Sequence, residues 1–226
     1  MRIDLKKFDF ESNKILSALP EKDKKVVLEQ AETLHFKKGK LIFYEGGIPT
    51  GVFMIQSGRA KIYKTGLDGK DQIFYVYKSG DLLGYHALLC NELYEDSCEV
   101  LEPCQISFIS ADRFNRLLDR IPNLRLLLIQ NMSHEFGVLA NIIIVLAQKN
   151  LRERLAIFLL VLNQRYDEQA IELPRDDLAN MVGTARESLG RLLKEFKEEE
   201  MISIVNRKIK LMNPTALLKI GSSQYS

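Results

Sequence analysis

Short apolar runs separated by glycine dominate the first half of the chain. Between Leu34 and Ile109 the runs are rich in β-branched and aromatic residues, and they occur at 41–44, 52–55, 60–63 and 73–77. Glycines lie between or beside them, at positions 39, 46, 47, 51, 58, 66, 69, 80 and 84. This spacing is typical of the turns in a β-sandwich or barrel, so the pattern predicts an all-β domain.

Helical patterns flank this region on both sides. Pro20 precedes an amphipathic segment, 21–32, and we expect a short helix there that covers the barrel. After Ile109 the pattern changes, because Ser110 is a residue type that begins helices and Pro122 restarts the chain.

A long helix is predicted next, from about residue 123 to about residue 148. Its apolar residues recur at intervals of three and four, and we call this set the seam: Ile129, Met132, Phe136, Leu139, Ile143 and Leu146. Such a heptad pattern indicates contact with another helix. The alternative is that the stripe packs on the chain's own barrel. Because other faces of the helix are apolar too, we expect the barrel on one side and a second copy of the helix on the other.

The most informative stretch is LPRDDLANMVGTARESLGRLL, residues 173–193. It predicts two short helices joined by a tight turn at Gly183, the pattern of a helix-turn-helix. Thr184 and Glu187 have the spacing of a capping box at the start of the second helix. The apolar residues of that helix recur at helical spacing and predict its buried face: Leu189, Leu192, Leu193 and Phe196.

The opposite face of the second helix carries Arg186, Glu187 and Arg191, with Gly190 adding no bulk among them. Arginine can donate two hydrogen bonds to O6 and N7 of guanine, and glutamate can accept one from N4 of cytosine. Charged helix faces are usually only solvated. Here the turn, the capping box and the two-sided pattern coincide, which favours a helix that reads DNA bases.

A β-hairpin with a basic tip is predicted after this helix. The apolar runs 202–205 and 209–211 flank Asn206, Arg207 and Lys208. As a wing, the hairpin would place Arg207 and Lys208 against phosphates, contacts that position a protein without specifying a sequence. An ordinary surface hairpin is the alternative.

Composition excludes several classes of protein. The 226 residues carry a net charge of +2, and 46% are hydrophobic, as in ordinary globular domains. The longest purely apolar runs, 142–147 and 155–162, are far shorter than the about 20 residues that cross a bilayer. The first ten residues lack the apolar centre of a signal peptide. We therefore expect a cytoplasmic protein without membrane contact.

The chemically reactive residues point to no catalytic or metal centre. Three cysteines without CxxC spacing, Cys90, Cys98 and Cys104, do not suggest a disulfide framework. The three histidines are far apart and lack the spacing of metal ligands. No nucleotide-binding or hydrolase motif occurs. We expect neither a bound metal nor enzymatic activity.

Four segments carry a resemblance to a known family: FKKGKLIFYEGG (36–47), VFMIQSGRAKIYK (52–64), SGDLLG (79–84) and VGTARESLGRLLKEF (182–196). From about residue 14 to about residue 220, the chain resembles the Crp/Fnr superfamily of bacterial transcription regulators. The resemblance implies an α+β fold in three parts. Residues 1–122 would form a β-roll of the cyclic-nucleotide-binding type, a double-stranded β-helix, that senses an effector. Residues 123–149 would form a dimerisation helix, and 150–226 a winged helix-turn-helix.

The same resemblance implies a homodimer that binds palindromic double-stranded DNA with TGTGA-like half-sites. Arg186, Glu187 and Arg191 match the base-reading residues of the family's recognition helix. Three neighbours would approach phosphates: Arg175, Thr184 and Ser188. RNA polymerase is a further expected partner.

The predicted effector loop departs from the family's cyclic-nucleotide-binding pattern. Gly84 is followed by Tyr85 and His86 instead of Glu-Leu, and the family's phosphate-binding arginine is missing. Residues 79–111 hold no Lys or Arg but contain six acidic residues, so a buried cyclic phosphate would lack a partner. We expect an unknown effector other than cyclic AMP, in a pocket that includes Gly84, Tyr85, His86 and Tyr94.

No cofactor is expected. The iron–sulfur cluster of the Fnr branch uses N-terminal cysteines, and residues 1–89 contain none. Haem needs an axial ligand, for which His86 is the only attractive residue, and Cys90 and Cys98 are alternatives for sensing oxidation. Two rival interpretations stay open. One is a haem- or metal-dependent sensor or enzyme whose barrel does the chemistry, and the other is a regulator that needs no ligand.

Overall fold

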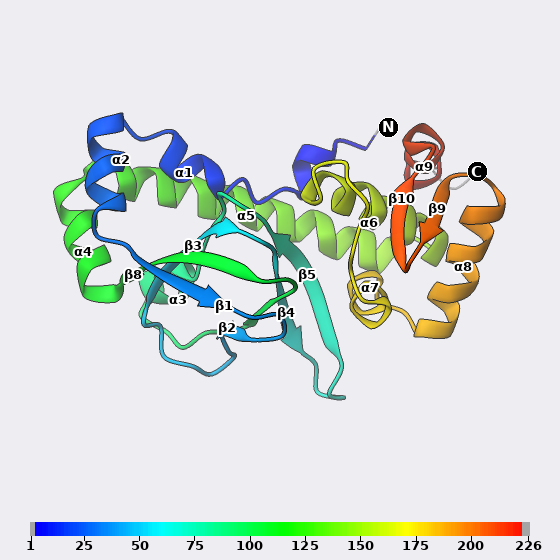
Figure 1. Cartoon of the computed structure of the whole chain (residues 1–226), viewed down its shortest axis with the longest axis horizontal. Coiled ribbons are helices and arrows are strands. Elements are labelled where there is room, and N and C mark those ends of the chain that lie inside the picture. The colour runs from blue at the N-terminus through cyan, green and yellow to red at the C-terminus, as the bar shows by residue number, and fades with distance from the viewer. Residues whose placement is uncertain (1–2, 223–226) are drawn as a thin grey trace. The chain divides into compact units, whose positions relative to one another are not determined.

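The computed structural model describes residues 3–222 (Figure 1). The first two residues of the predicted domain 1–122 and the last four of 150–226 lie outside this range. The chain divides into two compact units, which are taken one at a time below. The β-roll unit consists of residues 10–65 and 75–137, and the C-terminal unit of residues 1–9, 66–74 and 138–226.

Eight strands build two four-stranded sheets, as the glycine-punctuated pattern predicts. In the first sheet the order is β1 (Glu32–Phe36), β8 (Cys104–Ser110), β3 (Gly51–Ser57) and β6 (Leu82–Leu83). In the second it is β2 (Leu41–Phe43), β7 (Ser97–Val100), β4 (Ala60–Thr65) and β5 (Asp71–Tyr77). Antiparallel pairing places Phe53 opposite Phe108 in the first sheet and Ile62 opposite Cys98 in the second.

Glycine is required at the turn between β3 and β4. Gly58 has a φ of +90°, and a Cβ there would lie 2.5 Å from Sγ of Cys104. No L-residue fits such a position without moving its neighbours. The interior of the roll is filled by aromatic rings, with Phe43 stacked on Tyr94 at 4.1 Å between centroids and Phe53 against Phe108 at 5.0 Å.

Four short helices belong to the β-roll unit: α1 (Asn13–Ser17), α2 (Glu21–Leu28), α3 (Tyr85–Cys90) and α4 (Ala111–Arg120). The helix predicted over 21–32 ends at Leu28, because residues 32–36 pair with β8 instead. Ser110 precedes α4, as predicted, but its hydroxyl makes no capping bond. The sequence pattern predicted no helix within the all-β region, so α3 is a correction.

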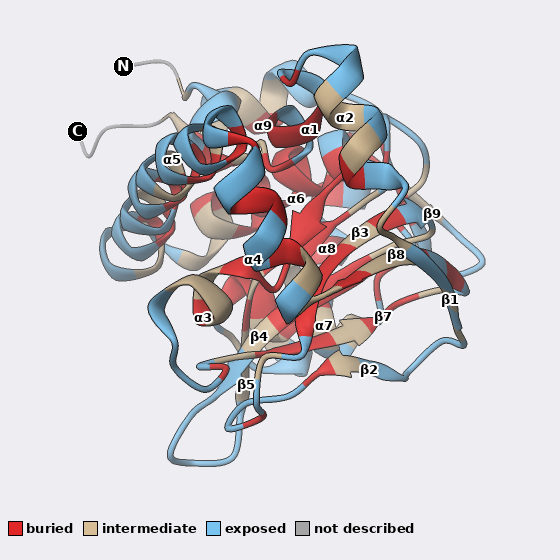
Figure 2. Ribbon diagram, turned by 90° about the vertical axis from the view of Figure 1, so that its left-hand side faces the viewer, coloured by how far each residue is buried: buried red, intermediate tan, exposed pale blue. Residues whose placement is uncertain are grey.

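The long helix α5 (Pro122–Gln148) confirms the prediction of a helix after Pro122. Figure 2 shows it buried along one side and exposed along another. Its buried residues include Leu124 and Leu128, which join the core under α1, α2 and α4. By length and composition alone, α5 could cross a membrane. Within the described chain, however, its polar residues Asn131 and Glu135 are buried in protein and hydrogen-bonded.

The C-terminal unit contains the remaining elements: the 3-10 helix η1 (Leu5–Phe8), α6 (Leu151–Arg165), α7 (Arg175–Val182), α8 (Arg186–Glu198), β9 (Ile202–Val205), β10 (Lys208–Leu211) and α9 (Pro214–Gly221). Asn150 and Glu153 form a capping box at the start of α6. At its other end the buried Arg165 pairs with Asp9, 3.1 Å away. Arg152 of α6 also pairs with Glu199, the residue that follows α8, at 2.6 Å.

Candidate nucleic-acid interface and effector loop

Helices α7 and α8 form the predicted helix-turn-helix around Gly183. This glycine ends α7 with a φ of +71°, and a Cβ there would lie 3.2 Å from a guanidinium nitrogen of Arg154. The predicted capping box of Thr184 and Glu187 is wrong. Ala185 occupies the N-cap position in an extended conformation, so α8 begins one residue later than a Thr184 cap requires and has no side-chain cap.

Helix α8 has the two faces that its sequence predicts. Leu189, Leu193 and Phe196 are buried, and Leu192 is partly buried. Arg186, Glu187 and Arg191, the residues predicted to read bases, are exposed on the helix together with Gly190. Around a Cβ added at Gly190 there is open space. The helix therefore offers a charged face that a ligand can approach closely.

Two of the exposed arginines are held by neighbours. Nη1 of Arg186 donates to both carboxylate oxygens of Asp176 in α7, at 3.1 and 3.0 Å. Nη2 of Arg191 donates to the hydroxyl of Ser188, one helical turn away, at 3.2 Å. Ser188 is one of the residues predicted to contact phosphate, whereas no sequence pattern indicated a role for Asp176.

Arg175, the first residue of α7, differs from these arginines. Its Nη1 is buried and has no hydrogen-bond partner within the described residues, and burial lowers the pKa of its guanidinium. Because this nitrogen is not exposed, an anion from outside the chain could reach it only if its surroundings moved. Thr184 is partly exposed in the turn after Gly183.

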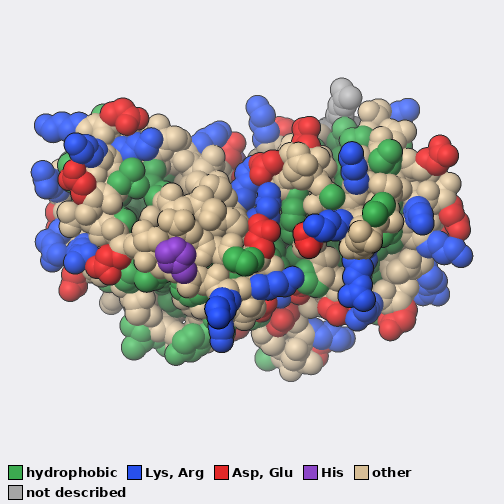
Figure 3. All heavy atoms as spheres, in the orientation of Figure 1, with side chains coloured by type: hydrophobic (Ala, Val, Ile, Leu, Met, Phe, Trp, Pro, Cys, Tyr) green, Lys and Arg blue, Asp and Glu red, His purple; other side chains and the backbone are tan. Residues whose placement is uncertain are grey.

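The predicted hairpin is present as β9 and β10. Its tip residues, Asn206 and Arg207, both have positive φ, as a tight two-residue hairpin turn requires. Arg207 and Lys208 are exposed, and Nζ of Lys208 pairs with Glu172 at 2.7 Å. In Figure 3, Lys and Arg side chains with acidic ones among them cover the region of α7, α8 and the hairpin.

The seam of α5 is exposed on the single chain. Phe136 is 77% exposed, Ile143 63% and Ile129 56%, and Leu139 is also exposed, while Met132 and Leu146 are partly buried. The helix packs on its own chain through other positions, among them Leu128, Val138, Ile142 and Val145. Four of the six seam residues therefore do not pack on the chain's own barrel, whereas Met132 packs against the core of the β-roll unit.

The four predicted effector-pocket residues lie at or near α3. Gly84 precedes the helix with a φ of +83°, and a Cβ there would lie 3.4 Å from the hydroxyl of Tyr94. Tyr85 and Tyr94 are buried, and His86 is partly exposed. The hydroxyl of Tyr94 has no hydrogen-bond partner within the described residues, and burial raises the pKa of Tyr94 to about 12.

A buried polar cluster joins α3 to α5. The carboxylate of Glu135 is 4% exposed and accepts hydrogen bonds from the hydroxyl of Tyr85 at 2.5 Å and the amide of Asn131 at 2.9 Å. Nε2 of His86 lies 3.6 Å from the other carboxylate oxygen. Sequence reasoning named Tyr85 and His86 but missed Glu135, because no local signal pairs residues so far apart in the chain.

The cluster shifts the pKa values of its members. Burial would lower the pKa of His86, but the hydrogen bond to Glu135 and the charges of Glu135 and Asp96 outweigh it and raise that pKa above 6.5. Burial also raises the pKa of Tyr85 well above its usual range, assisted by the Glu135 charge. When His86 is protonated, it is the charged partner of the buried carboxylate of Glu135.

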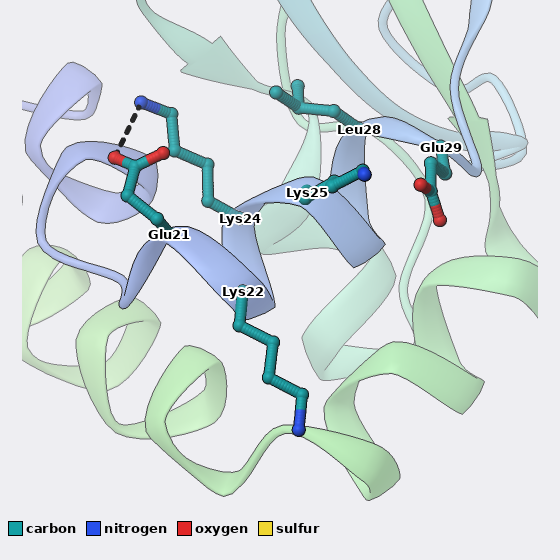
Figure 4. Close-up of a pocket in the computed structure, with 6 residues that line it drawn as sticks. All are labelled: Glu21, Lys22, Lys24, Lys25, Leu28 and Glu29. Carbon is teal, nitrogen blue, oxygen red and sulfur yellow. Dashed lines mark ion pairs between the residues drawn. The ribbon is translucent and has the colours of Figure 1, made fainter.

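Two surface hollows lie elsewhere in the β-roll unit. One, of about 650 Å³, is lined by α2 and its end alone, including Lys22 and the ion pair of Lys24 with Glu21 (Figure 4). Another, of about 570 Å³, is lined by residues around the end of α3, such as Ala87 and Leu93. Neither is lined by the predicted pocket residues. Within residues 3–222, no group of three or more His, Cys, Asp or Glu could hold a metal ion.

The comparisons with known proteins agree with this geometry. Residues 33–121 match the family model of the cyclic nucleotide-binding domain, and residues 153–220 match that of the Crp-like helix-turn-helix domain. The chain is 28% identical over 194 residues to a fumarate and nitrate reduction regulatory protein from Yersinia pestis, covering 83% of this chain and 77% of that one. The homologous regulator from Escherichia coli is also 28% identical, over 192 residues, covering 82% of this chain and 76% of that protein.

Solved structures have the same fold. FixK2 from Bradyrhizobium japonicum superposes with a TM-score of 0.75 at 19% identity, covering 86% of this chain and 99% of that one. A transcriptional regulator of the CRP/FNR family from Thermus thermophilus gives 0.69 at 22% identity, covering 85% and 99%. With the β-roll, the long helix and the helix-turn-helix in this order, the chain belongs to the Crp/Fnr superfamily of DNA-binding transcription regulators.

Proposed function

We propose that the protein is a homodimeric regulator that reads TGTGA-like half-sites in palindromic DNA. The observation that carries the proposal is the exposed face of α8, where Arg186, Glu187 and Arg191 surround a glycine and the opposite face is buried. On this proposal the two arginines each bind a guanine, and the glutamate accepts from a cytosine.

Phosphate contacts would fix the register of α8 in the major groove. Arg175, which is partly exposed at the start of α7, would make one such contact. Thr184 and Ser188 are partly exposed, and Arg207 and Lys208 are exposed on the hairpin. These groups would position the protein without selecting a sequence.

The exposed seam supports the homodimer. Aromatic and aliphatic side chains repeat in a heptad pattern along a helix that already packs on its own chain by other positions. Contiguous exposed apolar surface of this kind marks an interface, and a heptad pattern is best covered by a second such helix. The two recognition helices would then lie roughly 34 Å apart, one turn of DNA.

An effector that binds at α3 would act through α5. The buried cluster of Tyr85, His86 and Glu135 links the helix after Gly84 to the helix that carries the seam. A ligand that favours one arrangement of this cluster would shift the population of dimer geometries that can bind DNA. Since residues 79–111 contain no Lys or Arg, the effector would not be a cyclic nucleotide.

The proposal divides the chain into an effector-sensing part, 1–122, a dimerisation helix, 123–149, and a DNA-binding part, 150–226. It includes RNA polymerase as a partner, a place in the cytoplasm, no membrane contact and no enzymatic activity. No bound cofactor is part of it.

Base reading is tested by alanine variants measured on a palindromic TGTGA-type site, on single-base variants of it and at several salt concentrations. Replacing Arg186, Glu187 or Arg191 should cost roughly 1–3 kcal/mol on the preferred site and relax discrimination at one base pair per half-site. Replacing Arg207 or Lys208 should weaken binding to all sequences alike and reduce the salt slope by about one per lost contact. If Arg191→Ala lost affinity uniformly and kept its discrimination, the assignment of α8 would be wrong.

A further inference from the structure

The ion pair of Asp176 with Arg186 connects the two helices of the helix-turn-helix. Asp176 lies in the first turn of α7, and Arg186 is the first residue of α8. One nitrogen of Arg186, Nη1, donates to both carboxylate oxygens at 3.1 and 3.0 Å. Both side chains are 64% exposed, and exposed ion pairs contribute little to folding stability. The pair is therefore of little use to the fold.

The pair has a consequence for the orientation of Arg186. A guanidinium reads guanine through two donors on one of its edges. With Nη1 directed at Asp176, the nitrogens Nη2 and Nε remain for a base. An unrestrained arginine side chain has many rotamers, and fixing one of them before binding lowers the entropic cost of the contact. The carboxylate thus prepares one edge of Arg186 for one guanine.

The same carboxylate disfavours DNA in general. A negative charge in the first turn of α7, beside the arginine that would enter the groove, is repelled by phosphates on DNA of any sequence. Only at the guanine that Arg186 binds do new hydrogen bonds compensate for this repulsion. A lower affinity for all DNA combined with a better contact to one base increases the ratio between right and wrong sites.

We propose that Asp176 is a positioning residue that sets the discrimination at the base pair contacted by Arg186. The proposal rests on the proposed function, in which Arg186 reads a guanine. Glu172 offers a matched comparison within the same unit. Its carboxylate also pairs with a cation of the DNA-binding surface, Lys208, at 2.7 Å, but that cation is expected to contact a phosphate.

Four variants test the proposal: Asp176→Asn, Arg186→Ala, the two combined, and Glu172→Gln. Each is measured for its dissociation constant on the preferred palindrome, on the palindrome changed at each single base pair, and on scrambled DNA. Asp176→Asn should tighten binding to scrambled DNA and reduce discrimination roughly twofold to fivefold at the base pair where Arg186→Ala also reduces it. Glu172→Gln should change binding to every sequence by the same factor.

Two results would overturn the proposal. If Asp176→Asn tightened binding to all sequences equally, the pair would be an ordinary surface ion pair. If Asp176→Asn reduced discrimination just as much when Arg186 is already alanine, Asp176 would act on the base without Arg186. A loss of base reading in the proposed function would look different, because Arg186→Ala by itself would then leave every position discriminated as before.

Discussion

The hydroxyl of Tyr85 in α3 donates a hydrogen bond to the buried carboxylate of Glu135 in α5. The two residues are 50 positions apart in the chain and come from the predicted effector loop and the long helix. A buried carboxylate is stable only when its oxygens are hydrogen-bonded or paired with a charge. A movement of α3 would therefore remove a hydrogen bond from the buried carboxylate of α5.

Removing the Tyr85 hydroxyl should destabilise the protein. Tyr85→Phe keeps the ring but deprives a buried carboxylate of one donor, which costs about 1–3 kcal/mol of the free energy of unfolding. Urea denaturation followed by circular dichroism measures this loss. Tyr44→Phe is the control. Because Tyr44 is exposed, this variant should have the same free energy of unfolding as the unmodified protein. Equal stability of both variants would show that the contact to Glu135 is not formed in solution.

The pH dependence of stability should carry a contribution from His86. Its folded-state pKa is raised above 6.5, so its charged form stabilises the fold. That contribution is complete below pH 6.5 and is lost as the pH rises through the folded-state pKa. As the pH rises above 6.5, the free energy of unfolding should therefore fall more steeply than it does in His86→Gln.

The groups that face His86 identify the cause. They are Glu135 of α5, Asp96 ahead of β7 and Tyr85 of its own helix. An NMR titration of the imidazole in Glu135→Gln should give a pKa lower than in the unmodified protein, because burial then acts without its main opposing partner. An unchanged pKa would assign the shift to other charges.

A charge placed in the seam should weaken the dimer without unfolding the protomer. Phe136 is 77% exposed on the single chain, so Phe136→Lys disturbs no core of its own. In a two-helix contact it would bury an unpaired ammonium group. Sedimentation equilibrium should show monomers at low micromolar concentration, and Leu139→Lys should act alike. Ile144→Lys, exposed on the same helix but outside the seam, should remain dimeric. If Phe136→Lys did too, the dimer surface lies elsewhere.

Cyclic nucleotides should change neither the stability of the protein nor its affinity for DNA. A ligand present at a hundred times its dissociation constant adds about 2.7 kcal/mol to the stability of the protein that binds it. Because residues 79–111 contain no Lys or Arg, millimolar cyclic AMP or cyclic GMP should leave both the melting temperature and the affinity for DNA unchanged. A calorimetric dissociation constant in the micromolar range for either nucleotide would contradict this.

Two glycines of the helix-turn-helix should respond in opposite ways to alanine. Gly183→Ala should destabilise the fold by about 1 kcal/mol or more, since the position requires a φ of +71°. Gly190→Ala should stabilise it by roughly 0.4–1 kcal/mol, because the site is a helix interior with open space around a Cβ. If DNA approaches α8 closely, Gly190→Ala should nevertheless bind the preferred site more weakly. Thermal unfolding and a DNA titration of both variants separate the two effects.

The periodic elements could be predicted from the sequence, because each repeats a burial pattern. The apolar face of α8 and the β-branched runs of the sheets both follow from side chains that face the core at regular intervals. The turn at Gly183 could also be predicted from the sequence, since few residues other than glycine adopt its backbone conformation.

The predictions that were wrong or missing concern features that no regular sequence pattern encodes. Thr184 and Glu187 have capping-box spacing, yet the turn after Gly183 places Ala185 at the N-cap. Residues 85–90 are too few to show a helical period, so α3 was hidden in a region of strands. The contacts of Glu135 and Asp176 depend on how separate helices meet, which no pattern within one helix reveals.

Glu135 and Phe136 are consecutive residues of one helix, the first buried against α3 and the second exposed on the seam. A helix transmits rotation as a rigid rod. At a Cα radius of about 2.3 Å, a sideways shift of about 1 Å at Glu135 turns the helix by roughly 25°. Phe136 must turn through the same angle. A backbone displacement of about 1 Å at Glu135 would thus swing an aromatic ring within the seam, with no part of α5 unfolding.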